Sequence, residues 1–198
     1  MKNLRNLAIA AAVGGGLYTA LILAEASTPG LDFGATKFVL PMVLGTGLFT
    51  GLNRQAGNRK TPVASDARRS EMLGFPPRPG RGWVVLMRDK SVATAAMGFD
   101  VSVDDTVIVQ LMAKRFAMVA LPAGAHRLSA HVPGAPGEFN FEPLDITVTP
   151  GAILFFGLRS SMGLMRSTLR FDPVADTPAL RTALAQMPMV ESQWHDEA

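Results

Sequence analysis

The sequence predicts a protein of two parts, an N-terminal transmembrane helical hairpin followed by an all-β antiparallel sandwich with a short C-terminal helix. Two uncharged stretches, residues 6–24 and 38–53, lie near the N-terminus. From residue 82 onward, short runs of Val, Ile, Leu and Phe alternate with turn residues, as in sandwiches and barrels. The predicted divisions are a two-span membrane anchor (1–54), a Pro/Arg-rich linker (55–81), a β-sandwich domain (82–187) and a flexible tail (188–198).

The first uncharged stretch is long enough to cross a bilayer as a helix. A hydrocarbon core about 30 Å thick needs about 20 mostly apolar helical residues, and residues 6–24 supply 19. The second stretch reaches this length when it is extended upstream to Phe33, with Lys37 reaching the interface through its long apolar stem. Pro29 and Gly30 break the helix between the two stretches.

The distribution of basic residues predicts which side of the membrane each part occupies. Lys2 and Arg5 precede the first span, and seven Lys/Arg follow the second within residues 54–81. The positive-inside rule then predicts a multi-pass membrane protein with both termini and the β domain in the cytoplasm. In the alternative, residues 1–26 are a signal peptide that is cleaved after Ala24-Glu25-Ala26, which leaves one span.

Small residues are frequent in both predicted spans, where they allow helix backbones to approach closely in lipid. Two roles are open for them, packing of the two spans against each other or docking onto a larger membrane complex. The helix-packing candidates are Gly14, Gly15, Gly16, Gly45, Gly47 and Gly51.

The net charge of +3 conceals an asymmetry between the linker and the domain. Residues 54–81 carry seven basic and two acidic groups, hence +5, whereas residues 82–198 carry nine basic and twelve acidic groups, hence −3. Nucleic-acid binding would place the basic excess on the folded domain, so no nucleic-acid partner is expected. The absence of cysteine excludes disulfides, cysteine metal sites and thiol nucleophiles.

The linker is expected to be an extended tether that contains one short helix. Residues 75–80 are rich in Pro and Gly, which excludes regular helix or central strand. Ser65 is a suitable N-cap for a helix over 65–73.

The domain is expected to contain about eight short strands and a final helix. Asp104-Asp105 forms a turn, and Thr177 caps a helix that begins at Pro178 and ends near Met187. The expected strands are 83–88, 99–103, 106–111, 116–121, 126–132, 139–148, 153–158 and 165–171. Alternation predicts a core of Trp83, Val85, Val101, Val103, Val119, Leu121, Leu128, Ile146, Val148, Leu154 and Phe156.

No arrangement of residues predicts catalysis, a cofactor or a metal. His126 and His131 are five apart on one strand and so face opposite sides. Ser160 and Ser161 have no accompanying His and Asp set. Met162 and Met165 could form an adaptable partner surface, because methionine suits such surfaces.

The order of several phrases resembles the bacterial domain of unknown function 2846. The phrases include Trp83-Val84-Val85-Leu86-Met87-Arg88, then Leu121-Pro122-Ala123-Gly124-Ala125-His126, then Pro150-Gly151 before Phe155-Phe156. The resemblance covers about residues 77–187 and implies a small β-sandwich like those of transthyretin and PEGA modules, often met in envelope lipoproteins. It implies no catalytic residue, and it suggests a periplasmic domain as the alternative. This chain lacks the lipoprotein cysteine, and Phe replaces the family's Tyr.

These observations predict a membrane-anchored, non-catalytic interaction or scaffold module of unknown partner, in contact with the lipid bilayer. The alternative is an accessory subunit of a larger integral membrane complex, docked through its glycine-rich spans. The long linker favours the first function, because a fixed cap would not need it. The glycines favour the second.

Overall fold

The computed structural model describes residues 2–59, 61–89, 94–133, 139–162 and 167–194. The chain forms two compact units, residues 1–57 and residues 58–198. The first unit is helical, and the second contains two β-sheets and two short helices. The β-rich domain and the C-terminal helix predicted from the sequence are therefore confirmed.

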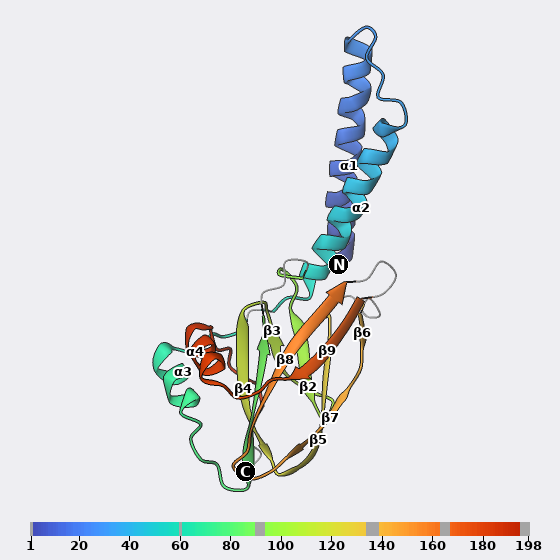
Figure 1. Cartoon of the computed structure of the whole chain (residues 1–198). Coiled ribbons are helices and arrows are strands. Elements are labelled where there is room, and N and C mark those ends of the chain that lie inside the picture. The colour runs from blue at the N-terminus through green and yellow to red at the C-terminus, as the bar shows by residue number, and fades with distance from the viewer. Residues whose placement is uncertain (1, 60, 90–93, 134–138, 163–166, 195–198) are drawn as a thin grey trace. The chain divides into compact units, whose positions relative to one another are not determined.

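The helical unit is a hairpin of two helices that run side by side (Figure 1). Helix α1 spans Lys2–Ser27 and helix α2 spans Thr36–Ala56. The turn between them contains Gly30 and Gly34, both with positive φ (81° and 53°), which glycine adopts without steric cost. Pro41 lies in the second turn of α2, where its missing amide removes one helical hydrogen bond, because only the first four amides of a helix lack an intrahelical acceptor.

Nine strands form two sheets in the described part of the domain. One sheet has five strands in the order β4-β1-β8-β9-β6, and the other has four in the order β3-β2-β5-β7. The strands are β1 (Arg81–Arg88), β2 (Phe99–Val103), β3 (Thr106–Leu111), β4 (Arg115–Pro122), β5 (Gly124–His131), β6 (Phe139–Phe141), β7 (Leu144–Val148), β8 (Ile153–Met162) and β9 (Ser167–Pro173).

The sheets are mainly antiparallel, and two pairs depart from the expected pattern. Strand β1 pairs with β8 in parallel, and β6 pairs with β9 in parallel. Both pairs join strands that are distant in sequence, where no hairpin turn fixes the direction. The extended region predicted over 139–148 is divided into β6 and β7 by Glu142 and Pro143, because Pro lacks the amide that a continuous ladder needs.

The two sheets share one hydrophobic core in a sandwich-like arrangement. Residues of the five-stranded sheet, such as Val84 and Leu86, pack with residues of the four-stranded sheet, such as Val101 and Leu128. Ten of the eleven predicted core residues are buried, and Leu154 is partly buried. Trp83 and Val85, however, lie in a second cluster on the opposite face of the five-stranded sheet. Strand β1 is buried on both faces, which explains its continuous apolar run.

Two short helices cover this second cluster, and their caps match the sequence prediction. Helix α3 (Asp66–Leu73) begins where Ser65 Oγ accepts a hydrogen bond from the Arg68 amide. Helix α4 (Pro178–Gln186) begins where Thr177 Oγ1 accepts one from the Leu180 amide. Met72 of α3 and Leu184 of α4 are buried in the cluster.

Two segments expected to be loose are packed onto the β domain. We call residues 58–64 the connecting segment (Lys60 lies outside the described residues) and residues 188–194 the C-terminal segment. Val63 and Val190 form an isolated antiparallel bridge, and Met189 bridges Phe116. The expectation of an extended tether and a flexible tail is therefore wrong for these residues. Buried apolar side chains outweigh the polar and Pro-rich composition that suggested disorder.

Candidate functional site

The two hairpin helices approach most closely at Gly14 and Gly45. A Cβ atom at Gly14 would lie 3.1 Å from the Pro41 carbonyl oxygen, and one at Gly45 would lie 3.3 Å from the Ala10 carbonyl oxygen. Side chains at these positions would push the backbones apart. The other glycines predicted for helix packing have no atom within 4 Å of such a Cβ; they are Gly15, Gly16, Gly47 and Gly51.

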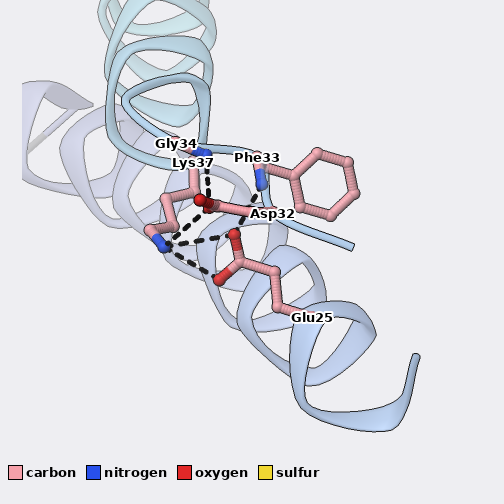
Figure 2. A network of polar contacts seen from close by, with 5 residues as sticks. All are labelled: Glu25, Asp32, Phe33, Gly34 and Lys37. Carbon is pink, nitrogen blue, oxygen red and sulfur yellow. Dashed lines mark hydrogen bonds and ion pairs between the residues drawn. The ribbon is translucent and has the colours of Figure 1, made fainter. Parts of the chain in front are cut away.

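Charged groups close the loop end of the hairpin (Figure 2). The Lys37 ammonium lies 2.9 Å from one Glu25 carboxylate oxygen, and the other Glu25 oxygen accepts a 2.7 Å bond from the Phe33 amide. Asp32 accepts a 2.7 Å bond from the Gly34 amide. This bond, helped by Glu25 and Lys37, holds the pKa of Asp32 below its usual range. The loop is therefore fixed by interactions that join both helices.

An amide pair closes the opposite end of the hairpin. Asn6 Nδ2 donates a 2.9 Å hydrogen bond to Asn53 Oδ1, and Asn6 is only 2% exposed. From Asn6 to Glu25 the helical rise is about 28 Å, and from Lys37 to Asn53 it is about 24 Å. No charged residue lies between these ends in either helix. The distance between the polar ends is close to the thickness of a bilayer core.

The exterior of the hairpin is apolar. Among the described residues, every exposed large hydrophobic side chain except Val63 belongs to the helical unit. Within that part of the chain, one helix, Leu4–Ser27, is long and apolar enough to cross a membrane on length and composition alone, with a mean hydropathy of 2.0. Exposed apolar surface on this scale marks an interaction with lipid or protein.

The histidines of the β domain are held by structural contacts. His126 Nδ1 lies 2.6 Å from Asp104 Oδ2, and His126 Nε2 lies 2.9 Å from the Pro122 carbonyl oxygen. The ring therefore bridges the turn residue Asp104 and the end of strand β4 at Pro122. His131 Nε2 lies 3.7 Å from Asp100 Oδ2. His195 lies outside the described residues.

Other residues considered for chemistry do not assemble into a site. Ser160 Oγ lies 2.9 Å from Thr94 Oγ1, which also accepts a hydrogen bond from the Arg88 guanidinium. No group of three or more His, Asp or Glu that could hold a metal occurs among the described residues. Met165 lies outside those residues, and Met162 ends strand β8, so their proposed partner surface stays a prediction.

Asp104 anchors the turn between β2 and β3 to strand β5. It has a φ of 47°, and Asp105 has a φ of 63°, values that short polar residues tolerate. Asp104 Oδ1 accepts a 2.8 Å bond from the Arg127 amide. Burial acts to raise the pKa of Asp104, but the hydrogen bonds from His126 and the Arg127 amide outweigh it and lower the pKa.

Replacing Asp104 is therefore expected to destabilise the domain in a pH-dependent way. The lowered pKa means that ionised Asp104 stabilises the fold above about pH 4, and that this contribution is lost as the pH falls through its folded-state pKa. Asp104→Ala should cost about 1–2 kcal/mol at pH 7 because two hydrogen bonds are lost from a partly exposed site. Asp104→Asn keeps the acceptor for the Arg127 amide and should cost less. Urea unfolding at pH 7 and pH 3 checks this, and equal losses for Asp104→Ala at both values would contradict it.

Arg88, at the end of β1, is the most distinctive polar group of the core and is 2% exposed. Its guanidinium donates to the carbonyl oxygens of Met97, Leu111 and Thr94 and to Thr94 Oγ1. It also stacks 3.8 Å from the centre of the Phe99 ring. Burial lowers the pKa of Arg88 to about 10, so the group remains charged at neutral pH. The Arg88 side chain therefore connects residues 94–97 to the end of strand β3 at Leu111.

Sequence reasoning missed this role of Arg88, because an Arg at the end of an apolar strand is usually exposed. No protein-family model, curated protein or solved structure matches the chain. The resemblance to the domain of unknown function 2846 therefore stays a prediction, and the function is inferred from the geometry.

Proposed function

We propose that this protein is a membrane-anchored, non-catalytic β-sandwich module that binds a protein partner at the surface of the bacterial inner membrane. The observation that carries this proposal is the hairpin, whose apolar exterior lies between polar ends about 28 Å apart along α1. A bilayer matches this distribution of polar and apolar groups. Headgroups and water surround the polar pairs at the two ends, and lipid tails surround the apolar exterior between them.

The hairpin supports two uncleaved spans rather than a signal peptide. Helix α2 packs on α1 at Gly14 and Gly45, so cleavage after Ala26 would remove the partner of α2. The basic residues before α1 and after α2 favour a cytoplasmic location for both termini. A periplasmic domain is the alternative.

The proposed role of the β domain is to bind rather than to catalyse. Within the described residues, its buried polar groups, including Arg88, Asp100 and Gln110, bond to one another or to the backbone. No buried side-chain polar atom there lacks a partner. This arrangement supports a rigid scaffold.

Two observations favour the second candidate, an accessory subunit of a larger membrane complex. The connecting segment is bound to the domain and Gly57 alone separates α2 from it, so the argument from a long free tether no longer holds. In addition, Gly47 and Gly51 of α2 have open space beside them. That face of α2 is suited to close packing against another transmembrane helix.

Purification in a mild detergent followed by mass spectrometry distinguishes the two candidates. A free interaction module should purify as a small species with no integral membrane protein in stoichiometric amount. An accessory subunit should bring such a protein with it, and Gly47→Leu should abolish the association while Gly16→Leu should not. If neither Gly47→Leu nor deletion of residues 82–198 changes any measured association, both candidates are wrong.

A further inference from the structure

The connecting segment is held at its end by the C-terminal segment. The Ala64 amide donates a 2.9 Å hydrogen bond to the Met189 carbonyl oxygen, and the Glu191 amide donates a 3.0 Å bond to the Pro62 carbonyl oxygen. Val63 and Val190 face each other between these two bonds. The first residues after the hairpin are thus paired with nearly the last residues of the chain.

The connecting segment is held at its start by a polar lock. Asn58 accepts a 2.7 Å bond from the Gly98 amide and donates one of 2.7 Å to the Ala96 carbonyl oxygen. The Arg59 guanidinium lies 2.7 Å from the buried Asp100 carboxylate. The Gln110 side chain links Arg59 to Asp100. It accepts a 2.6 Å hydrogen bond from the Arg59 amide and donates one of 2.7 Å to the Asp100 carboxylate.

The C-terminal segment, in turn, is bound to the edge strands of both sheets. The Val190 amide donates a 2.8 Å bond to the Phe116 carbonyl oxygen on β4, and the Gln193 amide donates one of 2.6 Å to Ile108 on β3. Met189 is buried in the cluster beneath α3 and α4, and Val190 in the core between the sheets. The C-terminal segment therefore links the edge strands β3 and β4 to the connecting segment.

These contacts are fewer than those of the sheets. The connecting segment makes one isolated bridge, from Val63 to Val190, rather than a ladder. Val63 is 52% exposed, and so is the side chain of Arg59. Segments with few buried apolar contacts and exposed hydrogen bonds open at lower free energy than the core. Strand β1, by contrast, is paired on both sides and buried along its length.

We propose that the connecting segment and the C-terminal segment form a releasable clasp, which opens while the two sheets stay folded. Opening frees residues 58–64, and seven extended residues add roughly 24 Å to the connection between the hairpin and the domain. A partner that withdraws the C-terminal segment would therefore lengthen the reach of the domain. This consequence rests on the proposed membrane anchor, whereas the clasp itself does not.

Hydrogen–deuterium exchange of the full chain in detergent tests the clasp. The amides of Ala64 and Glu191 should exchange together, at least about 100-fold faster than the Val85 amide in β1 and at least about tenfold slower than unprotected amides. Exchange of Ala64 at the rate of Val85 would show that the clasp opens only when the domain unfolds, and would overturn the proposal. Exchange of Ala64 at the unprotected rate would overturn it too, because no clasp would exist.

Two variants and a control separate clasp opening from general destabilisation. Asn58→Ala removes two hydrogen bonds without touching the core, so it should speed exchange at Ala64 about tenfold and leave Val85 unchanged. Val63→Ser, at the half-exposed side of the bridge to Val190, should also speed it. Gln186→Ala, an exposed α4 substitution, should change neither. If Asn58→Ala speeds Ala64 and Val85 equally, the segment belongs to the core and the proposal fails.

Because the chain contains no cysteine, one engineered disulfide can hold the clasp closed without competing thiols. A disulfide between Val63→Cys and Val190→Cys joins facing residues of an antiparallel bridge, a geometry that disulfides accept. Oxidation should abolish the extra exchange of Ala64 caused by Asn58→Ala, and reduction should restore it. Exchange that is unaffected by oxidation would overturn the proposal.

All these exchange measurements are independent of whether the hairpin crosses a membrane. A failure of the clasp proposal is therefore distinguishable from a failure of the proposed function.

Discussion

Arg88→Met is expected to destabilise the β domain by about 2–4 kcal/mol. The substitution removes the donor that the carbonyl oxygens of Met97, Leu111 and Thr94 share. Thr94 keeps bonds to the Met97 amide and to Ser160 Oγ, but each buried group left unsatisfied costs about 1–3 kcal/mol. Desolvation of the guanidinium, which lowers its pKa to about 10, offsets part of this loss. The net effect remains large because methionine cannot replace the stacking on Phe99 and the four hydrogen bonds together.

Urea unfolding of the full chain in detergent measures this loss. Arg170→Met is the matched control, since the Arg170 side chain is 68% exposed and pairs with Asp172 at the surface, so it should change stability by less than about 0.5 kcal/mol. Arg88→Lys keeps the charge but cannot reproduce the forked geometry, and should lie between the two. Equal stability of Arg88→Met and the control would contradict the structural role of Arg88.

Gly14→Leu is expected to separate the two helices of the hairpin. Even a Cβ atom at this position lies 3.1 Å from the Pro41 carbonyl oxygen, and backbone cannot move aside as a side chain can. Overpacking of this kind costs about 1–3 kcal/mol, which corresponds to a fivefold or greater shift in helix association. Crosslinking of Tyr18→Cys to Phe38→Cys with a short bifunctional thiol reagent reports it, because the native ring centres lie 5.5 Å apart and the background has no cysteine.

Gly47→Leu is the matched control for helix separation. It places the same side chain on α2 at a position with open space beside it, so the Tyr18→Cys/Phe38→Cys crosslink should form as in the parent chain. If Gly14→Leu and Gly47→Leu change the crosslinking yield by the same amount, the effect of leucine does not depend on its position in the hairpin. The close crossing at Gly14 would then be wrong.

Local chemistry predicted the short elements well. The caps at Ser65 and Thr177 were identifiable because a hydroxyl before a helical run satisfies a free amide. The Asp104-Asp105 turn followed from the tolerance of Asp for positive φ. These features depend on neighbours in sequence, and the structure places each one as predicted.

Features that depend on distant contacts were not predictable from one sequence. Trp83 and Val85 were chosen as core residues by taking every second position of their strand. That strand is apolar at every position because both of its faces are buried, so the sequence could not show that these two residues belong to the second cluster. The C-terminal segment was assigned to a loose tail, although Met189, Val190 and Trp194 are apolar. Those three residues were the available signal, and their burial against β3 and β4 is what secures the segment.

The hairpin was only partly predictable for the same reason. Glycine enrichment indicated close packing, but helix phase decides which glycines meet, and of the six candidates the contact involves Gly14 and Gly45. The polar pairs Asn6–Asn53 and Glu25–Lys37 join residues that become neighbours only when the two helices lie antiparallel. Their separation along the helices is the strongest structural support for a membrane-spanning hairpin.

The sidedness of two single cysteines tests the membrane anchor most directly. Thr28→Cys lies in the hairpin loop and Ala183→Cys on the exposed face of α4, and each would be the only thiol of its chain. In sealed membrane vesicles of known orientation, an impermeant maleimide should label Thr28→Cys from the periplasmic side and Ala183→Cys from the cytoplasmic side. Labelling of both positions from the same side, or recovery of the chain in the soluble fraction, would contradict a hairpin that crosses the bilayer twice.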